Sequence, residues 1–197
     1  MSKIAFFDFD GTITQKDTLW VFLLWRFGVL QVLAGVVVNA PWLAGYTLRL
    51  VRNDQAKERL LGYFLKHMPV NAFNEACRRF AQDCIPQLVR PGAHAEINRL
   101  KGEGYQIVVV SASPENWVGP WAGAQGLEVL ATRLQVHNGQ LTGKFEGKNC
   151  HGREKVHRIQ QAYPTAAYTH IVAYGDSSGD RPMMALRQPG YYKPFRN

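Results

Sequence analysis

Three apolar runs, each ending in polar residues, predict the strands of a buried sheet. They are residues 3–8 (KIAFFD), 106–111 (QIVVVS) and 169–176 (THIVAYGD), and such runs are typical of parallel strands that are covered on both faces. Segments of helical character precede the second and third runs, at residues 92–102 and 153–163. This alternation predicts a doubly wound α/β fold with a Rossmann-like parallel sheet, in which ligands bind beyond the carboxyl ends of the strands.

A long segment without strand-like runs separates the first predicted strand from the rest of the sheet. Residues 17–90 therefore predict a helical cap, inserted into a core made of residues 1–16 and 91–197. In the second half of this insertion apolar residues recur every three or four positions, which predicts one amphipathic helix. These positions are Phe73, Cys77, Phe80, Cys84 and Leu88, and Pro86 and Pro91 then mark the return to the core.

The first half of the insertion contains a stretch without acidic or basic side chains, residues 27–48, between Arg26 and Arg49. Its length approaches that of a bilayer span. Polar residues and a proline interrupt it, and one crossing would separate the two parts of the core. Two interpretations remain: a helical hairpin packed inside the cap, or an element that dips into a membrane or faces lipid.

A group of basic residues closely follows this stretch: Arg49, Arg52, Lys57 and Arg59. They form either a solvated helix face or a surface for anionic head groups. Further along, Asn138-Gly139 between apolar residues predicts a tight β-hairpin over residues 136–141.

The composition indicates the cellular compartment and the charge of the partner. The 197 residues include three cysteines without a C-x-x-C pair, which favours a reducing compartment over a disulfide or thiolate site. The chain runs at once into its first strand, so we expect a cytoplasmic protein, either free in the cytoplasm or at the cytoplasmic face of the membrane. A net charge of +8 favours an anionic partner, which could be a phosphate ester, a nucleic acid or an acidic lipid surface.

Paired acidic residues close two of the predicted strands. Asp8 and Asp10 follow the first strand, and Gly11 permits a sharp turn directly after them. Asp176 and Asp180 follow the third strand in the same manner. Carboxylates that meet at one edge of a sheet repel each other unless a proton or a hard cation such as Mg²⁺ relieves them.

With these motifs the chain resembles the haloacid dehalogenase superfamily of phosphohydrolases, in the branch that contains phosphoserine phosphatase. The resemblance covers residues 3–195. It implies that Asp8 is the nucleophile and that Asp10 is the general acid and base. It also implies that Ser111, with the backbone amides of Ala112 and Ser113, binds the phosphoryl group.

The same resemblance implies a phosphate-neutralising lysine and a metal. Lys155 is the preferred lysine because it falls in the first turn of a predicted helix, and Lys148 is the alternative. The metal would be Mg²⁺, held by Asp8, the backbone carbonyl of Asp10, Asp176 and Asp180. None of the six histidines is assigned to catalysis.

The chain departs from the phosphoserine phosphatase pattern at three places. Asp17 stands where a glutamate usually reads the substrate ammonium, Gly11 replaces a serine, and Ala112-Ser113 replaces a glycine pair. We therefore expect a phosphomonoester that is either a small phosphometabolite or a phospholipid head-group phosphate such as phosphatidylglycerophosphate. The apolar, basic cap resembles that of relatives which act on the second class, and peripheral membrane contact through the cap would follow.

A rival hypothesis is a non-catalytic protein that uses the same fold to bind an anion or a nucleic acid. The presence of both Asp8 and Asp10 argues against it. No motif that interleaves aromatic and basic residues for nucleic acid is evident, so we expect no nucleic-acid partner. Oligomeric state stays open.

Overall fold

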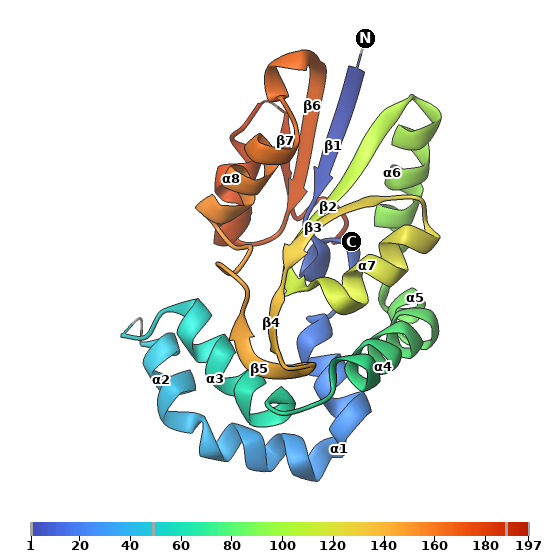
Figure 1. Ribbon diagram of the computed structural model, residues 1–197. Coiled ribbons are helices and arrows are strands. Elements are labelled where there is room, and N and C mark those ends of the chain that lie inside the picture. The colour runs from blue at the N-terminus through green and yellow to red at the C-terminus, as the bar shows by residue number, and fades with distance from the viewer. Residues whose placement is uncertain (1, 49, 188, 197) are drawn as a thin grey trace.

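The computed structural model describes residues 2–48, 50–187 and 189–196 as a sheet flanked by helices, with further helices beyond one end of it (Figure 1). The strands are β1 Ser2–Phe7, β2 Tyr105–Pro114, β3 Glu128–Thr132, β4 Leu134–His137, β5 Gln140–Phe145, β6 Tyr168–Gly175 and β7 Gly190–Tyr192. The helices are α1 Thr18–Val38, α2 Ala40–Thr47, α3 Asn53–Leu65, α4 Val70–Asp83, α5 Ile85–Leu88, α6 Pro91–Gly102, α7 Glu115–Ala124, α8 Arg153–Ala162 and α9 Arg181–Met184.

Five strands form the main sheet, in the order β3-β2-β1-β6-β7, and neighbouring strands in it run parallel. This confirms the predicted α/β class. In the sheet β2 and β3 lie on one side of β1, and the later strands β6 and β7 lie on its other side. The loops after β1 and β6 therefore diverge at the switch point of the sheet, where α/β proteins bind ligands.

Strand β1 is buried on both faces, which explains its unbroken apolar sequence. Ala5 and Phe7 belong to the apolar cluster that includes α6 and α7, whereas Ile4 and Phe6 belong to the cluster with α8 and α9. Successive side chains of a strand point to opposite faces. The central strand is thereby fixed between two helical layers (Figure 1).

The insertion is helical, as predicted, and comprises α1 to α5. The single amphipathic helix predicted from Phe73 to Leu88 is wrong in its extent, because α4 ends at Asp83 and Leu88 lies in the separate short helix α5. Pro86 has no N–H to continue the helical ladder and its ring clashes with the preceding turn. Phe73, Cys77 and Phe80 do form the buried face of α4.

Two backbone segments join the insertion to the sheet and pair with each other. Gln15 N–H donates to Leu88 O at 2.8 Å, and Arg90 N–H donates to Ile13 O at 2.8 Å. The entering and leaving chains thus form a short antiparallel connection. The exact division into cap and core at residues 17 and 90 remains a prediction.

The predicted hairpin is present as β4 and β5, with Asn138 and Gly139 at positive φ in its turn. It lies against the cap rather than the main sheet. His67 N–H donates to Leu141 O at 2.9 Å, and Leu141 N–H donates to Met68 O at 2.9 Å. Below, "cap" means α1 to α5.

The uncharged stretch forms the second half of α1, together with α2. Helix α1 consists of two helical segments that are separated at Gly28, whose φ of 77° and ψ of 167° are not helical. By length and composition α1 could cross a membrane, since the mean hydropathy of its most apolar window is 2.1. In the structure 22% of that window is buried. Among the basic residues that follow, Arg49 lies outside the described residues, and Arg52 forms an exposed ion pair with Asp54.

Candidate active site

The turn after β1 brings the first pair of aspartates against the end of β6. Gly11 has a φ of +79°, a conformation that L side chains rarely adopt, and a Cβ there would lie 2.4 Å from Asp176 Oδ2. Only glycine permits both the turn and this approach. The two acidic motifs, more than 160 residues apart in the chain, therefore meet at the switch point.

Lys155 links two of these aspartates. From the first turn of α8 its Nζ lies 2.5 Å from Asp8 Oδ1 and 2.6 Å from Asp180 Oδ1, and all three side chains are buried. Burial alone would lower the pKa of Lys155, but the two carboxylates raise it above its usual range. Lys148 is exposed, so the structure brings Lys155 and not Lys148 to Asp8.

The environments of the two carboxylates differ. Burial raises the pKa of Asp8 to about 7, although Lys155 acts in the opposite direction. Asp180 is also buried, yet Lys155 and the N–H and hydroxyl of Ser177 hold its pKa below the ordinary value. Ser177 donates to Asp180 Oδ2 from its backbone N–H at 2.9 Å and from its hydroxyl at 2.6 Å, which locks Asp180 in place.

Three carboxylates converge on a point that fits a divalent cation. One oxygen each from Asp8, Asp176 and Asp180 lies within 4.8 Å of the others. Hard oxygen donors with this much negative charge suit Mg²⁺. Asp176 also pairs with Arg196, so in this arrangement each aspartate of the cluster has a cationic partner.

The side chain of Asp10 turns away from this cluster. Its Oδ1 accepts hydrogen bonds from Thr18 N–H at 2.7 Å and Thr18 Oγ1 at 2.6 Å, and its Oδ2 accepts one from Ser113 Oγ at 2.6 Å. Trp117 Nε1 donates to Thr18 Oγ1 at 3.1 Å and holds that hydroxyl in place. Asp8 and Asp10 are thus positioned by separate sets of partners, so the surroundings of the two carboxylates differ.

The predicted phosphoryl-binding residues lie at the end of β2. Ser111 is fully buried, and its Oγ accepts a hydrogen bond from Ser113 N–H at 3.0 Å. The carbonyl of Ala112 accepts a hydrogen bond from Lys57 Nζ at 2.9 Å. This strand end therefore meets both the aspartates of the core and a lysine of the cap.

Lys57 corrects an interpretation made from the sequence. It does not lie on a solvated helix face or point toward lipid head groups, but extends from α3 to the end of β2. Burial lowers the pKa of Lys57, whereas the carboxylates of Asp17, Asp10 and Asp8 act to raise it. Burial also raises the pKa of Asp17, whose Oδ1 accepts from Leu19 N–H at 2.9 Å and caps α1.

Sequence reasoning missed the partners that the cap brings to this site. Thr18 and Lys57 come from α1 and α3, and Ser113 had been considered only for its backbone amide. Asn149 was also missed; its Nδ2 donates to Asn53 Oδ1 of the cap at 2.8 Å, while its Oδ1 accepts from Thr132 Oγ1 at 2.9 Å. The one available signal was the position of Thr18 directly after Asp17, at the start of the first cap helix.

Comparison with known proteins identifies the family. A model of haloacid dehalogenase-like hydrolases matches residues 5–185. The chain belongs to this family. Protein CicA of Caulobacter vibrioides is 37% identical over 193 residues, which cover 96% of this chain and 85% of CicA.

Two further relatives of this haloacid dehalogenase-like hydrolase are phosphatases. A phosphoserine phosphatase of Methanocaldococcus jannaschii is 27% identical over 185 residues, covering 90% of this chain and 79% of that protein. A solved phosphoserine phosphatase with a phospho-aspartyl intermediate analogue shares the fold, with a TM-score of 0.69 at 23% identity over 96% of this chain and 85% of that one. The chain is a phosphohydrolase of the phosphoserine phosphatase-like branch, as its motifs predicted.

Proposed function

We propose that this enzyme hydrolyses phosphomonoesters in two steps through a phosphoryl group carried on Asp8. The observation that supports this best is that two neighbouring carboxylates have separate sets of partners. Asp8 faces Lys155 and the acidic cluster, while Asp10 is held by Thr18 and Ser113. One acid can attack while the other carries a proton.

In the first step an oxygen of Asp8 forms a bond to phosphorus as the ester P–O bond breaks, and Asp10 gives its proton to the departing alcohol. In the second step Asp10 takes a proton from water, whose oxygen bonds to phosphorus as the bond to Asp8 breaks. Inorganic phosphate leaves, and both aspartates return to their starting states. Ser111 and the adjoining backbone amides orient the phosphoryl oxygens, and Lys155 neutralises their charge.

Mg²⁺ is the proposed cofactor, with Asp8, Asp176, Asp180 and the backbone carbonyl of Asp10 as its ligands. When bound it neutralises the clustered carboxylates and the phosphoryl oxygens. The close approach of the three carboxylates supports this assignment. Lys155 and Arg196 supply further positive charge around them.

The proposed substrate is a small phosphometabolite or a phospholipid head-group phosphate, met in the cytoplasm or at its membrane face. Phosphoserine belongs among the candidate substrates because two of the similar proteins are named phosphoserine phosphatase. Asp17 has a shorter reach than the usual glutamate, and Lys57 beside it adds a positive charge at the cap entrance. We therefore expect phosphoserine to be a poorer substrate than an ester without an ammonium group.

The test is phosphate release from phosphoserine, a lysophospholipid phosphate and several sugar phosphates, with Mg²⁺ and with chelator. We expect metal-dependent release that is lost in Asp8→Asn, and mass spectrometry of acid-quenched wild type should locate a phosphoryl group on Asp8. Release that persists in Asp8→Asn would overturn the nucleophile assignment. No release from any ester, together with salt-sensitive binding of DNA or RNA, would support the non-catalytic rival instead.

A further inference from the structure

Helix α1 and helix α2 leave an unusually apolar surface on the cap. The second half of α1 buries few of its side chains, notably Val32, and Gly35 lies close to Phe64. Five of its large apolar side chains are 58% to 83% exposed, namely Val29, Leu30, Leu33, Val37 and Val38. Gln31 is the one polar residue between Val29 and Val38, and a helix segment this apolar belongs in a protein core or in contact with lipid.

The exposed surface continues beyond α1 and includes several aromatic residues. We define the apolar face as the exposed large side chains of α1, α2 and the residues just after α2: Trp20, Leu24, Trp25, Val29, Leu30, Leu33, Val37, Val38, Trp42, Tyr46, Leu48 and Leu50. In Figure 1 α1 and α2 follow the outer edge of the cap, away from the main sheet. Exposed apolar side chains in this number mark an interaction site, and tryptophan and tyrosine favour the boundary between water and lipid.

The geometry of α1 favours lying on a membrane over crossing it. Gly28 breaks the helix, and residues 29–38 form a segment about 15 Å long at about 1.5 Å per residue. That is roughly half of the ~30 Å hydrocarbon core of a bilayer. Residues 18–27 pack into the cap through Leu19, Phe22 and Leu23, which ties the helix to the folded domain.

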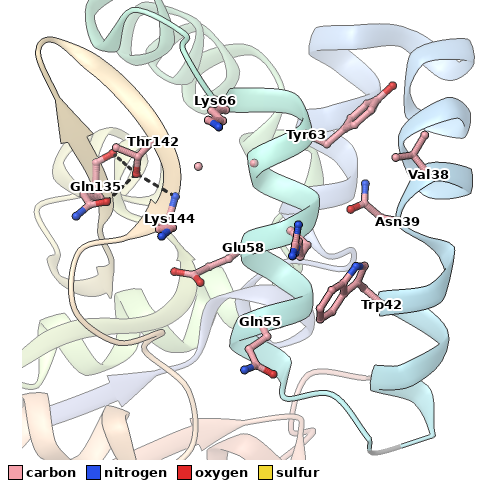
Figure 2. Close-up of a pocket in the computed structure, with 13 residues that line it drawn as sticks. Val38, Asn39, Trp42, Gln55, Glu58, Tyr63, Lys66, Gln135, Thr142 and Lys144 are labelled. Carbon is pink, nitrogen blue, oxygen red and sulfur yellow. Dashed lines mark hydrogen bonds between the residues drawn. The ribbon is translucent and has the colours of Figure 1, made fainter.

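Charges around the apolar face complement an anionic surface. No acidic residue occurs between Asp17 and Asp54, and Arg26 is exposed beside the face. A groove of about 820 Å³ adjoins the face at Val38 and Trp42 and passes beside α3 to the β4–β5 hairpin (Figure 2). Its charged lining residues are Arg59, Lys66 and Lys144 against a single acid, Glu58.

We propose that the apolar face docks on an anionic lipid bilayer, with α1 and α2 in the plane of the interface. The exposed leucines and valines enter the acyl boundary, the tryptophans lie at head-group level, and the basic residues meet the phosphate groups of the lipids. Arg59, whose guanidinium lies 4.5 Å from the ring centroid of Trp42, joins the aromatic and basic parts of this surface. This interaction does not depend on the proposed hydrolytic chemistry.

The test is co-sedimentation of the full chain with vesicles of phosphatidylglycerol and phosphatidylcholine in equal parts, compared with phosphatidylcholine alone. We expect binding to the anionic vesicles that weakens with added salt. The double variant Leu30→Gln, Leu33→Gln should bind at least about tenfold more weakly, because two inserting side chains lose their transfer free energy. Arg26→Gln should bind more weakly only to the anionic vesicles.

The control is the double variant Val136→Gln, Tyr192→Gln, which replaces exposed apolar side chains outside the apolar face and should bind like wild type. Circular dichroism and hydrolysis of a soluble ester show that each variant is folded, independently of vesicle binding. Equal binding by all variants, or no binding by a monomeric wild type, would overturn the proposal. A wild-type dimer that becomes monomeric in Leu30→Gln, Leu33→Gln, with no vesicle binding, would assign the face to a second copy of the chain instead.

Discussion

Two lysines approach the aspartates from different parts of the molecule. Lys155 belongs to α8 in the core and is bonded to Asp8 and Asp180, whereas Lys57 belongs to α3 in the cap and is bonded to Ala112 O. Their tasks therefore differ. Lys155 compensates the charge of Asp8 from within the core, whereas Lys57 compensates charge at the site only when the cap lies over the strand ends, as it does here.

Replacing Lys155 tests the first of these roles. Lys155→Met should lower kcat by about 10²- to 10³-fold, the usual cost of one preorganised electrostatic partner at a reacting group. Lys148→Met is the matched control, since its side chain is exposed, and should stay within about twofold of wild type. Steady-state phosphate release measures both, and an equal loss in the two variants would contradict the assignment.

Replacing Lys57 tests the second role. Lys57→Met should lower kcat/KM by about 10- to 100-fold, because a charge-assisted hydrogen bond contributes about 1.5–3 kcal/mol and each 1.4 kcal/mol is about a factor of ten. Lys66→Met, just after the end of the same helix and exposed, should leave kcat/KM of a soluble ester nearly unchanged. If Lys57→Met retains full kcat/KM on every ester that the wild type hydrolyses, then Lys57 serves the fold and not the substrate.

At the scale of elements, the hairpin and α3 approach each other through two glycines. Gly143 of β5 has a φ of +80°, and a Cβ there would lie 2.5 Å from the Cα of Gly62 in α3. No side chain separates the two backbones at this point. The contact holds the β4–β5 hairpin against the helix that carries Lys57.

Gly143→Ala should destabilise the protein by about 2–4 kcal/mol, as the left-handed backbone and the steric overlap each contribute. Gly139→Ala is the matched control: its φ is +74° and nothing lies within 4 Å of the added Cβ, so about 1–2 kcal/mol is expected. The free energy of unfolding in guanidinium chloride measures both. Equal losses would show that the hairpin moves away from α3 without cost.

At the scale of the whole molecule, one apolar cluster runs from the main sheet through α7 into the cap. Trp117 of α7 is its central side chain, fully buried and stacked on Phe22 of α1 with ring centroids 4.8 Å apart. It also meets Phe80 of α4 at 6.2 Å. Cap and core share this packing, so we expect them to unfold together.

Trp117→Ala should lower the free energy of unfolding by about 3–5 kcal/mol, the usual range for truncating a buried tryptophan. Hydrogen exchange during denaturant unfolding should then show α4 and α6 losing protection at the same denaturant concentration, in both the variant and the wild type. Trp20→Phe, which changes a half-exposed indole of α1, is the control and should cost little. Loss of protection in α4 well before α6 would show that the cap is an independent folding unit.

The sequence alone was sufficient for the three central strands of the main sheet and for the acids that follow two of them, whereas the edge strands β3 and β7 were not predicted. Strands β1, β2 and β6 are buried on both faces, so their apolar runs have no alternative pattern. Asp8 and Asp10 follow β1, and Asp176 and Asp180 follow β6. Lys155 was preferred over Lys148 because the resemblance places the lysine in the first turn of a helix, and the structure brings Lys155 to Asp8. Helix ends were predicted less accurately, since α4 ends at Asp83 and not at the predicted Leu88.

Only the tertiary structure determined which cap residues contact the site and which apolar residues of the cap are buried. Lys57 has the sequence context of a solvated helix residue, and only the packing of α3 over the end of β2 brings it to Ala112. Residues 27–48 have a composition suited both to a packed hairpin and to a lipid-facing element, and only the folded chain divides their side chains between buried and exposed positions. Local pattern determines which face of a strand or helix is apolar, whereas what covers that face depends on contacts between residues far apart in the chain.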